Sequence, residues 1–146
     1  MAVWRRSAAG PVVFTNGVFD LFHAGHVHVL ESAATLGGSL IVGVNSDASA
    51  RRLGKGADRP IVPEGDRARI VASLECVDGV VLFDEETPAG LVAALLPDVL
   101  VKGGDYQPDA VVGADIVRAH GGRVVIVPLL PDRSATRLLE RLRATP

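Results

Sequence analysis

Two histidines stand three residues apart in the segment His23-Ala24-Gly25-His26, and their spacing is the first sign of chemistry in this sequence. A short apolar run precedes them and a helical pattern follows, so both imidazoles are expected at the start of a helix. Main-chain amides at a helix start lack partners within the helix and carry partial positive charge, which favours a bound anion. Gly25 lets the backbone approach such a ligand closely. By themselves, two histidines at this spacing fit a helix-surface pair equally well, and zinc would need further ligands.

The segment before the histidines makes the pattern more specific. It reads Thr15-Asn16-Gly17-Val18-Phe19-Asp20, and Gly17 permits a tight exit from the preceding strand. Strand, glycine turn, paired histidines and helix together predict a phosphate site. The sequence contains no Gly-x-x-x-x-Gly-Lys-Ser/Thr motif and no Gly-x-Gly-x-x-Gly after its first strand. A P-loop and a dinucleotide-binding redox domain are therefore both disfavoured.

Alternating strands and helices must position these residues. Apolar runs predict strands at 12–15, 39–44, 77–83, 98–101 and 123–127, and helical patterns occupy 26–36, 63–75, 87–96, 109–120 and 134–143. Continuous apolar strands joined by helices predict right-handed βαβ units and a parallel sheet covered on both faces. The expected fold class is thus α/β, a doubly wound, Rossmann-like five-stranded parallel sheet, with 1–146 as a single domain. Ligands of such sheets bind beyond the carboxyl ends of the strands, where the histidines follow.

Composition narrows the class of protein. The chain has 146 residues, 48% of them apolar, which suffices for one core without metals or disulfides. Its 15 basic and 17 acidic residues give a net charge of −2, so neither nucleic acid nor membrane is expected as a partner. The basic stretch 51–69 fits a phosphate-facing segment or a solvated loop. The single cysteine, Cys76, excludes an intrachain disulfide and favours a cytoplasmic location.

Several segments together resemble the HxGH nucleotidyltransferases, the cytidylyltransferase-like superfamily, over nearly the whole chain. Beside residues 15–26, the resemblance rests on Val44-Asn45-Ser46-Asp47, Gly54-Lys55-Gly56, Arg59-Pro60, Asp66-Arg67, Val101-Lys102-Gly103-Gly104-Asp105-Tyr106 and Ser134-Ala135-Thr136. The full set is most similar to the adenylyltransferase domain of the bifunctional heptose-phosphate kinase/adenylyltransferases, expected here as a stand-alone domain.

The resemblance implies a reaction and its catalytic residues. An oxygen of a heptose 1-phosphate would attack the α-phosphorus of ATP, which binds with Mg²⁺, and pyrophosphate would leave. His23 and His26 would donate hydrogen bonds near the reacting phosphorus, as preorganised donors do at developing charge. Lys55, between glycines, would close over the phosphates as a compact charge, and Arg67 would contact a phosphate. No metal ligand from the protein itself is expected.

The same resemblance implies the binding residues. The expected nucleotide-binding positions are Val18, Phe19, Gly25, Lys102, Gly103, Asp105, Arg133, Ser134 and Thr136. The expected substrate-binding positions, at the ends of the first two strands, are Thr15, Asn16, Gly17, Asp20, Asn45 and Asp47. Structural alternatives stay open: Asp20 suits a turn, Asp47 and Ser134 suit helix caps, and packing is favoured over base stacking for Tyr106.

Three positions depart from the family pattern. Val18 stands where relatives often carry a small polar or sulfur residue, Ala135 replaces a hydroxyl residue, and Arg133 is the nearest substitute for an arginine that some relatives carry before the last motif. Two other functions therefore stay open: a CTP-dependent cytidylyltransferase acting on glycerol 3-phosphate or a similar alcohol phosphate, and a non-catalytic nucleotide-binding protein. The resemblance also implies a homo-oligomer.

Overall fold

Five parallel strands form a single sheet in the order β3-β2-β1-β4-β5. They are β1 (Val12–Gly17), β2 (Ser39–Asn45), β3 (Gly79–Phe83), β4 (Val99–Gly103) and β5 (Arg123–Val127). The computed structural model describes residues 2–54 and 56–144. All neighbouring strands pair in parallel, which confirms the predicted five-stranded parallel α/β sheet.

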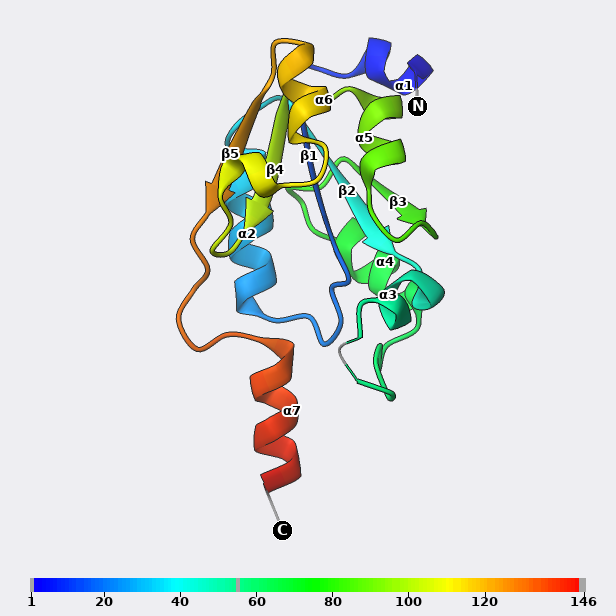
Figure 1. Cartoon of the computed structure of the whole chain (residues 1–146), viewed down its shortest axis with the longest axis vertical. Coiled ribbons are helices and arrows are strands. Elements are labelled where there is room, and N and C mark those ends of the chain that lie inside the picture. The colour runs from blue at the N-terminus through cyan, green and yellow to red at the C-terminus, as the bar shows by residue number, and fades with distance from the viewer. Residues whose placement is uncertain (1, 55, 145–146) are drawn as a thin grey trace.

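Helices cover both faces of this sheet (Figure 1). The helices are α1 (Ala2–Ser7), α2 (Ala24–Ala34), α3 (Asp47–Arg52), α4 (Glu64–Ala72), α5 (Ala89–Leu95), α6 (Ala114–Ala119) and α7 (Ala135–Ala144), with a 3₁₀ turn η1 (Pro108–Ala110). The central strand β1 serves both layers, since Val13 packs in one core with Leu30 of α2, and Phe14 packs in the other with Val92 of α5. Alternate side chains of a strand point to opposite faces, which is how one apolar run supplies two cores.

The observed helices differ from the predicted ones at several points, including the ends of α2 and α4, which come at Ala34 and Ala72 rather than at 36 and 75. The helix expected at 109–120 is wrong in its first part, where η1 is followed by Gly113 in a left-handed conformation (φ 94°) and α6 starts only at Ala114. Helix α2 begins two residues earlier than expected because His23 caps it. The short helices α1 and α3 were not predicted, and α3 is capped by Ser46 rather than by Asp47.

The switch in strand order lies between β1 and β4, and the two strands pair only briefly there. Val13 pairs with Val99 and Phe14 with Leu100, after which the ladder stops. Thr15 Oγ1 then donates a 2.8 Å hydrogen bond to the Val101 carbonyl oxygen, so a side chain ties the strands where main-chain pairing has ended. A doubly wound sheet binds its ligand at such a switch point.

Helix α7 extends away from the rest of the molecule at the C-terminal end of the chain (Figure 1). None of its described residues is buried, and Leu142 is 69% exposed. Arg143 near its end forms an ion pair with Asp58. Within the described part of the chain, no helix has the length and apolar character needed to cross a membrane.

Candidate active site

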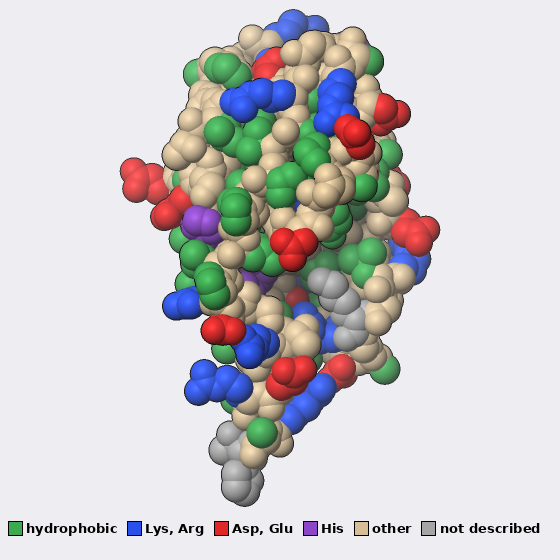
Figure 2. Space-filling view, turned by 60° about the vertical axis from the view of Figure 1, so that its left-hand side comes forward, with side chains coloured by type: hydrophobic (Ala, Val, Ile, Leu, Met, Phe, Trp, Pro, Cys, Tyr) green, Lys and Arg blue, Asp and Glu red, His purple; other side chains and the backbone are tan. Residues whose placement is uncertain are grey.

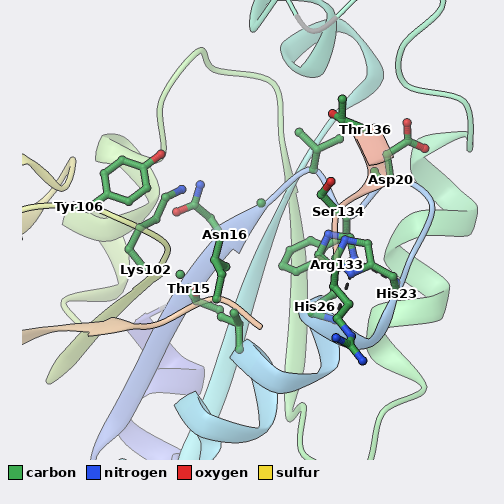
Figure 3. Close-up of a pocket in the computed structure, with 18 of the residues that line it drawn as sticks. Thr15, Asn16, Asp20, His23, His26, Lys102, Tyr106, Arg133, Ser134 and Thr136 are labelled. Atoms are coloured by element: carbon green, nitrogen blue, oxygen red, sulfur yellow. Dashed lines mark hydrogen bonds between the residues drawn. The ribbon is translucent and has the colours of Figure 1, made fainter. Parts of the chain in front are cut away.

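A cavity of about 310 Å³ lies beyond the carboxyl ends of β1 and β4, between the first residues of α2 and α7 (Figure 3). Figure 2 shows this region as a hollow with a histidine and basic side chains beside it. The cavity brings together most of the predicted site residues: Thr15, Asn16, Gly17, Val18, Phe19, Asp20, His23, Gly25, His26, Lys102, Gly103, Arg133, Ser134 and Thr136. It is also lined by Val29, Arg59, Tyr106, Leu129 and Ala135, none of which was among the predicted binding residues.

The two histidines form the N-terminal cap of α2. His23 Nδ1 accepts a hydrogen bond from the Gly25 amide at 3.0 Å, and His26 Nδ1 accepts one from the His23 amide at 3.2 Å. Their rings stack with centroids 3.8 Å apart. Because each Nδ1 acts as an acceptor, the proton of each neutral ring is assigned to Nε2 from this network. The pair therefore carries two N–H donors, which suits an anion better than a metal ion.

Burial keeps the His23 ring of this cap neutral, and close packing at Gly25 restricts its position. Burial lowers the pKa of His23 below its ordinary value of 6.5, so the ring is neutral at pH 7 and Nδ1 keeps its acceptor role. A Cβ atom at Gly25 would lie 2.7 Å from His23 Cε1, a distance that carbon atoms do not tolerate. A larger residue at this position would have to displace the His23 ring, while the predicted approach of the Gly25 backbone to a ligand stays a prediction.

Asp20 lines the cavity, yet both its carboxylate oxygens are engaged. Arg59 Nε and the Ile61 amide donate to Oδ2, each at 2.8 Å, and the Val62 amide donates to Oδ1 at 2.9 Å. Burial alone would raise the pKa of Asp20, but the two amides and the guanidinium together hold that pKa below its ordinary value of 3.8. Asp20 thus fastens the segment 59–62 to the loop that follows β1.

Arg67 does not line the cavity, in contrast to its predicted contact with a phosphate. The side chain is fully buried, at 0% exposure. Its guanidinium donates to the carbonyl oxygens of Val62 at 2.8 Å, Val18 at 2.6 Å and Asn45 at 2.8 Å, and to Asp47 Oδ1 at 2.8 Å. The planar fork of arginine satisfies several acceptors at once, so Arg67 joins the loops after β1 and β2 to the segment before α4.

Three further predicted residues lie elsewhere. Asn45 is 3% exposed, and its Nδ2 donates to Ser49 Oγ at 3.0 Å rather than facing the cavity. Asp47 pairs with the buried guanidinium described above. Asp105 is exposed and does not line the cavity. Lys55 lies outside the residues that the structure describes.

At the wall formed by β4, apolar side chains pack closely against the backbone of the strand. A Cβ atom at Gly103 would lie 2.8 Å from Val29 Cγ2 and 3.3 Å from Leu129 Cδ2, so any larger residue would force these side chains to shift. Lys102 Nζ lies 5.4 Å from the ring centroid of Tyr106, and both side chains line the cavity. Figure 3 places these two residues at one end of the cavity and the histidines at the other.

The start of α7 forms the opposite wall. Ser134 Oγ accepts a hydrogen bond from the Arg137 amide at 3.0 Å, the geometry of the predicted N-cap. Ser134, Ala135 and Thr136 all line the cavity. Two helix starts therefore border one cavity, and both favour a bound anion. Among residues 2–54 and 56–144, no group of three His, Cys, Asp or Glu side chains is placed to hold a metal ion.

Comparison with known proteins identifies the family. Residues 14–139 match the family model described as cytidylyltransferase-like. The chain belongs to the cytidylyltransferase-like family. It is 55% identical over 132 residues to the bifunctional protein HldE of Geotalea uraniireducens (strain Rf4), covering 90% of this chain and 27% of that protein. It is 56% identical over 138 residues to HldE of Syntrophotalea carbinolica (strain DSM 2380 / NBRC 103641 / GraBd1), covering 94% of this chain and 28% of that protein. The chain thus spans just over a quarter of the length of these relatives.

Solved structures agree with this assignment. A lipopolysaccharide core biosynthesis protein from Thermoplasma volcanium GSS1 superposes with a TM-score of 0.67 and 32% identity, covering 84% of this chain and 98% of that one. Pantothenate synthetase from Thermus thermophilus, at 20% identity and a TM-score of 0.59 over 88% of this chain and 60% of that one, shares the fold. The family match and the HldE relatives identify the chain as a nucleotidyltransferase.

Proposed function

We propose that this nucleotidyltransferase transfers AMP from ATP to a heptose 1-phosphate and releases pyrophosphate. The observation that carries the proposal is the identity of more than half of the aligned positions with HldE proteins across nearly the whole chain. The capped histidine pair beside a cavity supports it, because the donors needed for phosphoryl chemistry are held in place before the substrate binds.

The reaction needs positioning more than acid–base chemistry. The attacking oxygen of the sugar phosphate is already an anion, so no strong general base is required. That oxygen forms a bond to the α-phosphorus of ATP, and the bond from this phosphorus to the β-bridging oxygen breaks, which releases pyrophosphate. The chain contributes donors aimed at the charge that develops, and holding two anionic reactants in line lowers the barrier.

The two ends of the cavity suit different parts of the ligands. The N–H donors of His23 and His26 and the start of α7 suit the phosphates, which arrive as the Mg²⁺ complex of ATP. The end that carries Lys102 and Tyr106 combines a cation with a ring and suits a base or a sugar phosphate. The carboxylate of Asp20 is already occupied by three donors, so it serves the protein rather than Mg²⁺.

The proposal is tested by product analysis. The protein is incubated with ATP, Mg²⁺ and D-glycero-β-D-manno-heptose 1-phosphate, and ADP-heptose and pyrophosphate are measured together. Parallel reactions contain CTP in place of ATP, or glycerol 3-phosphate in place of the sugar phosphate. Formation of ADP-heptose with the first pair supports the proposal, and turnover only with CTP and an alcohol phosphate contradicts it.

A histidine variant tests the site itself. His26→Ala removes a donor near the reacting phosphorus, and we expect kcat to fall about 100- to 1,000-fold, as it does when one such donor is lost elsewhere. His120→Ala is the matched control, because His120 is exposed at the end of α6 and outside the cavity. Equal rates of pyrophosphate release from His26→Ala and the unaltered chain would contradict the assigned site.

A further inference from the structure

Arg59 is a buried cation on the wall of the cavity, in the segment between α3 and α4. It is 8% exposed and lines the cavity together with Asp20. Its Nε donates to Asp20 Oδ2 at 2.8 Å, and the two side chains are 9% and 1% exposed. A guanidinium at this depth has lost most of its hydrating water, which is unfavourable unless the charge is paired and its N–H groups are hydrogen-bonded.

Among the described residues, the hydrogen bond to this guanidinium engages its Nε atom and leaves its Nη atoms for another acceptor. Within residues 2–54 and 56–144, Asp20 is its hydrogen-bond partner, through Nε alone. No buried side-chain nitrogen or oxygen in the described chain lacks a partner, so the two Nη atoms are not sealed in the protein. Because Arg59 lines the cavity, a ligand there is the expected acceptor for the Nη donors.

Asp20 holds Arg59 in this position from two sides. It accepts the Nε hydrogen bond, and it also accepts the amides of Ile61 and Val62, which fix the chain just after Arg59. Side chain and backbone are therefore both fastened to the same carboxylate. A planar donor fork that is already ordered loses little conformational freedom on binding a ligand.

The position of this pair indicates the ligand. Figure 3 shows Asp20 at the end of the cavity that also carries His23, Ser134 and Thr136, away from Lys102. That end also has the starts of two helices, each of which favours a bound anion. Two helix starts and a guanidinium around one space suit a chain of linked phosphates.

From this arrangement we infer that Arg59, fixed by Asp20, binds the β- and γ-phosphates of the nucleotide and stays with pyrophosphate as it leaves. The inference rests on the proposed function in one respect, namely that the polyphosphate belongs to a nucleoside triphosphate. It assigns a role to Arg59, for which the family resemblance implies none.

Binding measurements separate this role from a merely structural one. Affinities for ATP, AMP and inorganic tripolyphosphate are measured by calorimetry, with Mg²⁺, for the unaltered chain, Arg59→Gln and Arg59→Lys. We expect Arg59→Gln to weaken ATP and tripolyphosphate about 10- to 100-fold, the range for loss of charge-assisted hydrogen bonds, and AMP less than about twofold. Arg59→Lys keeps the charge without the fork and should show the same selectivity with a smaller loss. Arg52→Gln, in the same basic stretch but exposed and outside the cavity, is the control.

Each outcome decides the inference. Equal weakening of ATP and AMP would show that Arg59 only supports the fold, and unchanged affinity for tripolyphosphate would exclude phosphate binding. A rise confined to the KM of the sugar phosphate would assign Arg59 to the other substrate and overturn the inference. Should Arg59→Gln fail to fold, the ratio of ATP to AMP affinity in Arg59→Lys decides. If ADP-heptose never forms while tripolyphosphate binding still depends on Arg59, the proposed function fails and this inference stands.

Discussion

Replacing Arg67 by methionine should destabilise the protein strongly, because four hydrogen bonds converge on this one fully buried side chain. Methionine fills a similar length but donates nothing, so three main-chain carbonyls and the Asp47 carboxylate lose their donor. At about 1 kcal/mol net for each bond, the loss is about 4 kcal/mol. That agrees with the ~3–5 kcal/mol typical when one partner of a buried ion pair is removed. Against a total stability of about 5–15 kcal/mol, this is a large fraction.

Urea denaturation of the unaltered chain and Arg67→Met would measure this loss, and thermal unfolding should show a drop in Tm of about 6–20 °C for a chain of this length. Arg69→Met is the control, since Arg69 lies two residues later in α4 and is exposed, and we expect a change within about 0.5 kcal/mol. A loss below about 1 kcal/mol combined with a tenfold weaker affinity for ATP would refute the structural role and restore Arg67 as a phosphate ligand.

Two further predictions concern pH and packing. Because burial lowers the pKa of His23 in the folded chain, the unfolded chain binds a proton more readily, so stability falls as pH drops below about 6.5. His23→Asn keeps an N-cap acceptor but does not titrate. The free energy of unfolding of this variant should therefore change less between pH 8 and pH 5.5 than that of the unaltered chain. An equal change in both proteins would contradict the argument that burial of His23 causes the pH dependence. Gly103→Ala places Cβ 2.8 Å from Val29 Cγ2 and should lower the free energy of unfolding by about 1–3 kcal/mol. The added methyl group should also narrow the cavity and thereby raise the Kd for ATP. In contrast, a Cβ atom at Gly90 on α5 meets nothing within 4 Å, so Gly90→Ala should stabilise the protein by about 0.4–1 kcal/mol in the same urea assay. Destabilisation by Gly90→Ala would contradict the use of Cβ distances to predict these effects.

The strands were predictable because each is a continuous apolar run with its own local signature. The expected 123–127 coincides with β5, and β1 and β2 differ from expectation only at their ends. The same pattern predicts where ligands bind, because parallel strands bring their carboxyl ends to one edge of the sheet. Local patterns thus indicated the edge of the sheet where the cavity lies, and the family resemblance supplied most of the lining residues.

Contacts between distant segments were not predictable in this way. Arg59 and Asp20 are 39 residues apart, and nothing in the letters around either one indicates the other. Arg67 has the residue type of a phosphate ligand, but its partners are main-chain carbonyls, which leave no trace in a sequence. The capping role of His23 was missed for a different reason, since Ser, Thr, Asp and Asn are the usual N-caps.

Helix α7 places one wall of the cavity on an element that buries none of its described side chains. Its starting residues, Ser134 to Thr136, meet the same cavity as the start of α2, so a ligand between the two helices adds contacts that the protein alone does not supply. Ligand binding and the docking of α7 are then linked equilibria, and each must favour the other by the same factor. For the proposed reaction, we therefore expect release of pyrophosphate to weaken the contact between the start of α7 and the start of α2.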